Sequence, residues 1–211
     1  VNYYNDDETP LDGVVVKLLE EGTTTVVASA TTDGSGFYSF ANVCPATYDV
    51  AITTTKPMRS INSTDAGQVN AWYVNQSGGI YPTIERVRFL AGDVNGDDNI
   101  VSYDASLIQQ YFLTLGTSPT FDNEWEFWKE DETINTQWQG SKVIQVDIPT
   151  GFTAVNQDFY GLVSGDFDRS NNPTVIKSSR SVNGTIKLKK GEEVLVNADE
   201  TIDLPVKALS A

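Results

Sequence analysis

The sequence contains no histidine, one cysteine and no long apolar run, and each of these absences excludes a class of protein. Without histidine, the chain lacks the commonest general base and a common ligand for transition metals. A single cysteine, Cys44, excludes an internal disulfide framework; with no partner base, we expect it to be a small, buried apolar residue. No run approaches the roughly 20 apolar residues of a membrane-spanning helix, so no membrane span is expected.

Basic residues are also scarce. The chain has 14 Lys and Arg residues against 29 Asp and Glu residues, which gives a formal net charge of −15. Such acidity argues against nucleic-acid binding and favours the binding of cations. The composition agrees with an extracellular or cell-surface bacterial protein, and we expect that localisation.

Residues 93–104 carry the clearest functional signal, because their oxygen-bearing side chains have the spacing of a calcium-binding loop. Counted from Asp93 as position 1, side-chain oxygens stand at positions 1, 3, 5 and 12, and position 7 adds a backbone carbonyl. The predicted ligands of this first Ca²⁺ site are Asp93, Asn95, Asp97, Asn99 through its carbonyl, and Asp104. The apolar spacing that follows, up to Leu113, predicts a helix. A polar turn is the alternative, but it does not account for Ile100 and Asp104 in register.

The loop departs from the EF-hand pattern at Asp98, where Gly is usual, and at Asp104, where Glu is usual. With the helix to Leu113, the run Gly92–Asp97 and Ser102–Asp104 resembles a dockerin, the calcium-loop-and-helix module of secreted bacterial assemblies. The resemblance implies a non-catalytic module with a cohesin-like or other β-sandwich domain as partner. It places the partner-binding residues at loop positions 10 and 11 of two repeats, which here are Ser63, Thr64, Ser102 and Tyr103.

An incomplete copy of the same unit lies upstream. Ile61–Val74 aligns with Ile100–Leu113 at an offset of 39 residues, with Ile, Ser, Asp and Ala coinciding. This copy keeps the back half of a loop, which ends at Asp65, but no ligands with 1-3-5 spacing precede it.

The front half of a calcium loop, without its back half, follows Gly165. Side-chain oxygens recur there with 1-3-5 spacing, but Lys177 stands at position 12, where the closing acid would be. We therefore raise the hypothesis of a second, split Ca²⁺ site built from Asp65, Asp166, Asp168, Ser170 and the carbonyl of Asn172. It requires Asp65 to lie within roughly 10 Å of Asp166. The alternative is that 165–172 is an ordinary polar turn and that Asp65 is an acid favoured by its helix dipole.

Residues 1–56 are expected to form an all-β sandwich. Short β-branched or aromatic runs bounded by turn residues predict strands at 13–19, 25–31, 36–40 and 47–53. This segment resembles the Cna-B-like, prealbumin-type domains of bacterial surface proteins. The residues that carry the resemblance are Thr9–Val16, Ala30–Phe40 and Pro45–Val50.

Residues 57–172 are expected to form an α+β dockerin-like module, with an aromatic insertion at about 114–163 that contains strands or extended segments. Residues 173–211 are predicted to be a linker and the first strands of a cohesin-like β domain that is truncated or completed by strand exchange, because a piece this short cannot bury its own core. The predicted fold class is thus mixed and multi-domain, with EF-hand-type loops between two β regions.

The function that these observations favour is a non-catalytic, calcium-stabilised structural and docking module. One alternative is a carbohydrate-binding accessory region of a polysaccharide-degrading enzyme, with a glycan as partner; its candidate platform residues are Trp72, Trp125, Trp128 and Trp138. Another is a subunit of an extracellular filament in which neighbouring copies exchange β-strands.

Overall fold

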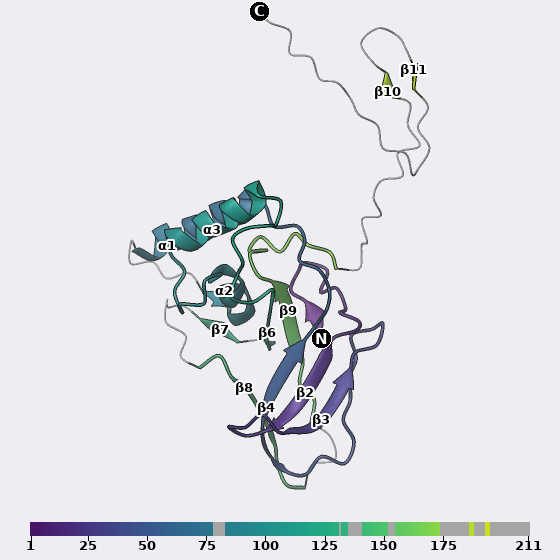
Figure 1. The fold of residues 1–211 in the computed structure, drawn as a ribbon. Coiled ribbons are helices and arrows are strands. Elements are labelled where there is room, and N and C mark those ends of the chain that lie inside the picture. Colours follow the sequence, from purple (N-terminus) through teal and green to yellow (C-terminus); the bar gives the residue numbers. More distant parts are fainter. Residues whose placement is uncertain are drawn as a thin grey trace, which may run out of the picture. The chain divides into compact units, whose positions relative to one another are not determined.

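The computed structural model describes residues 1–77, 83–130, 132–134, 141–151 and 155–173, and two short strands nearer the C-terminus. The chain divides into two compact units, Val1–Thr174 and Val175–Ala211. The first unit contains all the predicted site residues (Figure 1). Its elements in chain order are β1 (Asn2–Tyr3), β2 (Val15–Glu20), β3 (Val26–Thr31), β4 (Ala46–Thr53), α1 (Ser63–Ser77), β5 (Ile84–Glu85), α2 (Arg86–Gly92), α3 (Ser102–Leu113), β6 (Trp125–Lys129), β7 (Thr133–Ile134), β8 (Ile144–Ile148) and β9 (Phe159–Val163).

Two sheets share one apolar core in this unit. The larger has the strand order β3-β2-β4-β8 and is antiparallel throughout, and the smaller has the order β1-β9-β6. Alternation explains the larger sheet, because every second residue of β2 points inwards: Val16 and Leu18 are buried, whereas Lys17 between them is only partly covered. Tyr3, Trp128 and Leu162 contribute to the same core from the smaller sheet.

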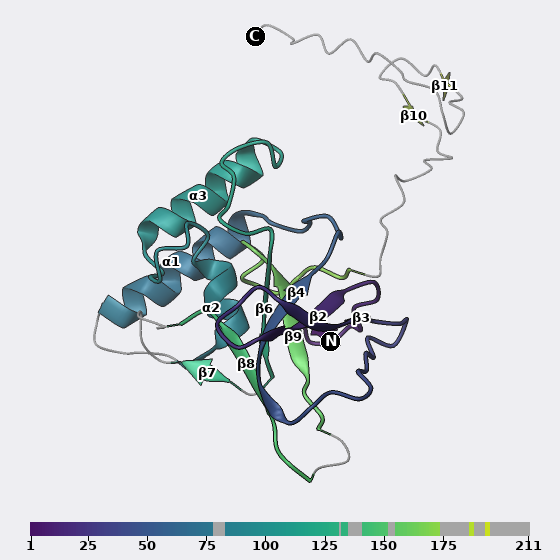
Figure 2. The same ribbon diagram turned by 60° about the horizontal axis from the view of Figure 1, so that its bottom comes forward.

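The helices form a second apolar cluster. Figures 1 and 2 both show α1 and α3 side by side, with α2 between this pair and the strands. Val69 and Ile108 are fully buried where α1 and α3 meet, and Phe89 of α2 packs beneath them against Trp72. The short two-stranded sheet of β5 and β7 borders this cluster through Ile84.

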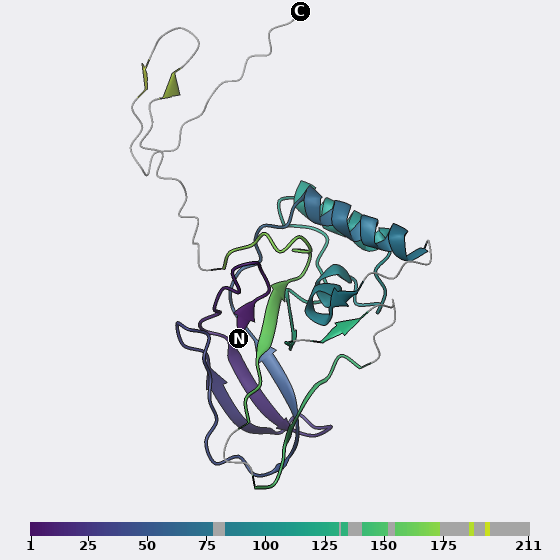
Figure 3. The ribbon, with the colours of Figure 1, turned by 180° about the vertical axis from the view of Figure 1, so that it is seen from behind.

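The strand pairing crosses the boundary at residue 56 that the sequence predicted. β8 and β9 both lie in the predicted aromatic insertion, yet β8 pairs with β4 and β9 pairs with β1 (Figure 3). The sandwich is therefore completed by strands far downstream of their partners, 102 positions between Ala46 and Ile148 and 158 between Asn2 and Tyr160. The segments 1–56 and 57–172 do not form separately packed bodies in the described part of the chain, since both fall within Val1–Thr174.

Two local expectations are wrong. Residues 36–40 form no strand, because their backbone groups are engaged elsewhere: the Asp33 carboxylate accepts hydrogen bonds from the amides of Ser35 and Phe37, and the Val1 ammonium donates to the Gly36 carbonyl. Cys44 is exposed and not buried, since it lies in the irregular segment before β4.

In the second unit the described residues are β10 (Ile186–Lys187) and β11 (Glu193–Val194), which pair antiparallel, Ile186 with Val194 and Lys187 with Glu193. Both fall within 173–211, where the sequence predicts a linker and the first strands of a β domain. The other residues of this unit lie outside the described residues.

Candidate metal centre

The continuous loop 93–104 lies between two helices, with α2 ending at Gly92 and α3 beginning at Ser102. Asp93 at position 1 organises it: its Oδ1 accepts the amide of Asp97 at 3.0 Å, and its Oδ2 accepts the amide of Asp98 at 2.9 Å. Asp98 is in the left-handed region with φ 65°, a conformation that Asp tolerates better than most residues. The loop is therefore closed on its first carboxylate.

Asp104 closes the loop from the other side. It is fully buried in the first turn of α3, and its Oδ2 accepts the amide of Val101 at 2.9 Å, which also caps the helix. Its second oxygen, Oδ1, is buried and has no hydrogen bond of ordinary geometry, although the backbone N–H of Asn95 lies near enough to the carboxyl to lower its pKa. Burial raises the pKa of Asp104 to about 6, and the nearby charges of Asp93 and Asp97 add to that effect. An orphaned, buried carboxylate oxygen is the group that a hard cation would satisfy.

A lysine also approaches this loop, which the sequence did not predict. Lys142 Nζ lies 3.5 Å from Asp93 Oδ2, 3.4 Å from Asp98 Oδ1 and 3.3 Å from the Gly96 carbonyl. Burial raises the pKa of Asp93, whereas the Lys142 charge lowers it. Lys142 therefore offsets part of the negative charge of the loop.

The two halves of the hypothesised split site lie together. Asp65 in the first turn of α1 and Asp166 and Asp168 in the turn after β9 have carboxylate oxygens that all lie within 4.8 Å of one another. Asp65 and Asp166 are completely buried. Among the residues that the structure describes, only these three acids lie that close together; Asp93, Asp97 and Asp104 of the continuous loop do not reach this spacing, so a cation there would have to draw them together.

The split loop repeats the hydrogen bonds of the continuous loop, position by position. In both, the amide of position 5 donates to Oδ1 of position 1 (Asp97 to Asp93 at 3.0 Å, Ser170 to Asp166 at 3.1 Å). In both, the amide of position 6 donates to Oδ2 of position 1, from Asp98 at 2.9 Å and from Asn171 at 3.3 Å.

The closing acids share one hydrogen bond and differ in another. Val101 at position 9 donates its amide to Asp104, and Asn62 donates its amide to Asp65 at 2.8 Å. Asp65 also accepts the amide of Asp168 at 2.8 Å through Oδ1. Position 4 is left-handed in both loops, with φ 71° at Gly96 and 64° at Arg169, whereas position 6 is left-handed only at Asp98. A loop assembled from two distant segments thus shares most of the hydrogen bonds of a continuous one, with a different backbone conformation at position 6.

The three acids of the split site are buried or partly buried and repel one another when they ionise. Burial raises the pKa of Asp65 to about 8, although amides of Asp168 and Asn62 lower it, and the charges of Asp166 and Asp168 raise it further. Burial likewise raises the pKa of Asp166 to about 7. Three acids held this closely are costly to ionise together unless a cation neutralises them.

The remaining predicted ligands lie at the rim of each loop. Asn95 is partly covered, and its side-chain amide donates to Asp97 Oδ2 at 2.9 Å. The backbone N–H of Asn99 donates to Asp97 Oδ1 at 3.0 Å. Ser170 is exposed, with its hydroxyl 3.5 Å from Asp166 Oδ1, and Asn172 is partly buried.

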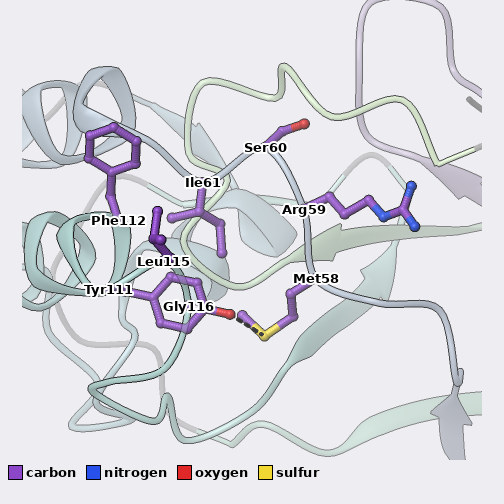
Figure 4. Close-up of a pocket in the computed structure, with 8 residues that line it drawn as sticks. All are labelled: Met58, Arg59, Ser60, Ile61, Tyr111, Phe112, Leu115 and Gly116. Carbon is purple, nitrogen blue, oxygen red and sulfur yellow. Dashed lines mark hydrogen bonds between the residues drawn. The ribbon is translucent and has the colours of Figure 1, made fainter. Parts of the chain in front are cut away.

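The four predicted partner-binding residues are all exposed, at the starts of α1 and α3. They are Ser63, Thr64, Ser102 and Tyr103. Next to the first pair lies a hollow of about 280 Å³ between the segment that leads into α1 and the end of α3. Figure 4 shows Met58 and Tyr111 among the residues that line it, with the Tyr111 hydroxyl 3.7 Å from the Met58 sulfur.

The tryptophans that suggested a glycan platform are mostly core residues. Trp72 and Trp128 are buried in the two apolar clusters, and Trp125 is partly buried, with its indole N–H donating to the Lys56 carbonyl at 2.8 Å. Trp138 lies outside the described residues.

Comparison with known proteins finds a similar domain family for one part of the chain. Residues 3–82 match the family model of the SdrD B-like domain, a β-sandwich of the Cna-B-like, prealbumin type found in bacterial surface proteins. No curated protein and no solved structure gives a match. None of the helices in the described part of the chain is long and apolar enough to cross a membrane. The matched residues span β1 to β4 and helix α1.

Proposed function

We propose that this chain is a non-catalytic, calcium-stabilised structural module of a secreted or surface-attached bacterial protein, with two Ca²⁺ sites. The observation that carries the proposal is that the continuous and the split loops share the hydrogen bonds from positions 5 and 6 to position 1 and from position 9 to position 12. The SdrD B-like match at residues 3–82 supports the structural part of the proposal.

The donor chemistry of both loops fits calcium. Each offers three carboxylates together with amide, hydroxyl or carbonyl oxygens, and calcium prefers six to eight oxygen ligands in a flexible geometry. In the first loop the ligands would be Asp93, Asn95, Asp97, the Asn99 carbonyl and Asp104. In the split loop they would be Asp65, Asp166, Asp168, Ser170 and the Asn172 carbonyl.

Bound calcium would bring a double positive charge next to the buried acids of each loop. The closing acids Asp104 and Asp65 are fully buried, and burial raises the pKa of each. A divalent cation would allow these groups to ionise without leaving the core, and would thereby stabilise the folded state by mass action.

Calorimetric titration of the full chain after removal of metal tests the proposal, with Asp93→Ala and Asp65→Ala each removing one site. We expect two Ca²⁺ per wild-type chain, one per variant, and a higher melting temperature with calcium. Asp147→Ala is the matched control, because Asp147 is an exposed acid on β8 that bonds Thr47 and faces neither loop. Absence of Ca²⁺ binding by the wild-type chain would contradict the proposal.

Docking is the second candidate function, and exposed apolar side chains at the end of α3 favour it. Phe112, Leu113 and Leu115 are 39%, 69% and 89% exposed, next to the hollow that Met58 lines. Exposed apolar groups gathered beside the start of α1 are typical of an interaction surface. Binding to a panel of cohesin-like domains, compared between the wild-type chain and Leu113→Asp with Leu115→Asp, tests this candidate. Binding that survives both changes would exclude this surface.

A further inference from the structure

The N-terminal strand reaches into the split site. Tyr3 of β1 is completely buried, and its hydroxyl donates a hydrogen bond to Asp166 Oδ2, the carboxylate at position 1 of the split loop. The same hydroxyl oxygen accepts the amide of Val163 at 3.2 Å. One phenol thus ties together strand β1, strand β9 and a predicted metal ligand that lies 163 residues away.

The three residues after Tyr3 contact the same loop. The Asn5 side-chain amide donates to the Asn171 carbonyl at 3.2 Å. Asp6 pairs with Arg169 at 3.0 Å, and the Arg169 guanidinium lies over the Tyr4 ring, 5.0 Å from its centroid. Four consecutive residues therefore hold one short loop, through both side-chain and backbone groups.

The strand ladder of β1 is short. Its pairing with β9 is parallel and contains two residue pairs, Asn2 with Tyr160 and Tyr3 with Gly161. Burial of Val1 and Tyr3 in the larger core and backbone hydrogen bonds to Thr9 and Leu11 also hold the strand. A two-residue ladder is a weak unit of sheet, so the contacts with the loop add to what fixes this strand.

The continuous loop has no such connection to the N-terminal strand among the contacts described. Oδ2 of its position 1 carboxylate, Asp93, faces Lys142, whereas the equivalent oxygen of Asp166 faces the Tyr3 hydroxyl. A lysine brings a competing positive charge to a cation loop. A tyrosine hydroxyl brings a hydrogen bond that orients the carboxylate and leaves its charge for the cation.

We propose that the split site is a cation-dependent lock on the N-terminal strand β1, with Tyr3 as the positioning residue that couples them. This inference rests on the proposed function, because it requires calcium at the split site. Calcium fixes Asp166 and its loop, and the loop fixes residues 3–6. By linkage, the seated strand raises the calcium affinity of the split site by the same factor by which calcium favours seating of the strand.

Hydrogen exchange of the full chain, with and without Ca²⁺, tests the lock. The amides to follow are those of Tyr3 and Tyr4, which donate to the Thr9 carbonyl at 2.7 Å and the Gly161 carbonyl at 3.0 Å. We expect calcium to slow their exchange at least tenfold in the wild type and in Asp93→Ala. In Asp65→Ala, and in the milder Asp168→Asn, calcium should slow it far less.

Tyr3→Phe isolates the hydroxyl, because the ring that packs edge-on against Trp125 remains. We expect calcium affinity at the split site to fall on the order of tenfold, as a lost hydrogen bond to a charged acceptor implies, and affinity at the continuous loop to stay unchanged. Tyr48→Phe is the matched control: Tyr48 is also buried, and its hydroxyl donates to the Cys44 carbonyl, away from both loops.

The outcomes separate the lock from the function on which it rests. If the wild type binds a single Ca²⁺ and Asp65→Ala does not change that number, the split site itself is excluded. If two Ca²⁺ bind and Asp65→Ala removes one, but Tyr3→Phe behaves as Tyr48→Phe and calcium leaves the β1 amides unprotected, the lock is overturned and the site stands.

Discussion

Asp104→Asn is expected to stabilise the protein without calcium and to weaken its response to calcium. The wild-type carboxyl is completely buried, and burial raises its pKa from the ordinary value of 3.8 to about 6. Asparagine has the same shape, can still accept the Val101 amide that caps α3, and carries no charge to bury. The substitution therefore removes the penalty for ionisation together with the negative charge that calcium would use.

The sign and size follow from linkage between protonation and folding. Well below pH 3.8 the carboxyl is protonated in both the folded and the unfolded chain, so it has no effect on stability. As the pH rises to about 6, the unfolded chain ionises first, and the cation-free folded state loses stability. The difference of about two pKa units corresponds to roughly 3 kcal/mol, which Asp104→Asn would restore at pH 8. This figure is an upper limit, because the new side-chain amide would face the Asn95 amide that lies near Asp104.

Urea unfolding of metal-free protein, followed by tryptophan fluorescence, measures this effect at pH 4 and at pH 8. We expect the variant to be clearly more stable than the wild type at pH 8, only slightly more stable at pH 4, and less stabilised by added calcium. Asp147→Asn, an exposed acid on β8, should show no such pH dependence. The reasoning fails if metal-free Asp104→Asn is no more stable than the wild type at pH 8.

Two further predictions concern the surroundings of the loops. Lys142→Met should raise the calcium affinity of the continuous loop several-fold, because it removes a positive charge that lies 3.5 Å from Asp93 Oδ2 and is only partly screened by solvent. Unchanged affinity in calorimetry would contradict this. Gly92→Ala should lower the free energy of unfolding in urea by about 1–3 kcal/mol, because a Cβ there would lie 2.8 Å from Ile100 Cδ1. Gly67→Ala should be neutral or stabilising, because Gly67 is an exposed residue of α1 and a Cβ there would have nothing within 4 Å. Equal effects of the two changes would refute the packing argument.

The helix after the continuous loop could be predicted from the sequence because its determinants are local, whereas the calcium site there stays a prediction. Ligand spacing over twelve residues and the helix after it depend on neighbours only a few positions apart. Even here the sequence placed the helix too late: α3 begins at Ser102, because Asp104 caps it by accepting the Val101 amide. The short helix α2 was not predicted, since seven residues that are mostly buried show no amphipathic period.

Contacts between distant segments left no signal in the sequence. Nothing in the local pattern around Tyr3 or Lys142 indicates a cation loop, because each meets its partner only after the chain has folded. The same limit explains the predicted boundary at residue 56. Alternation predicts that β4 is a strand, but not that β8, about 100 residues later, is its neighbour.

The split loop lies between these two cases. Each half carried a recognisable fragment of the pattern, and the absence of a complement on either side suggested that they meet. In the continuous loop, the chain itself joins position 7 to position 8, whereas in the split loop these positions are Asn172 and Ile61. No peptide bond joins these two positions of the split loop, so closure of the loop depends on the surrounding fold and on any bound cation. That dependence gives a physical reason for Tyr3 to hold Asp166 from a third segment, a support that the continuous loop does not need.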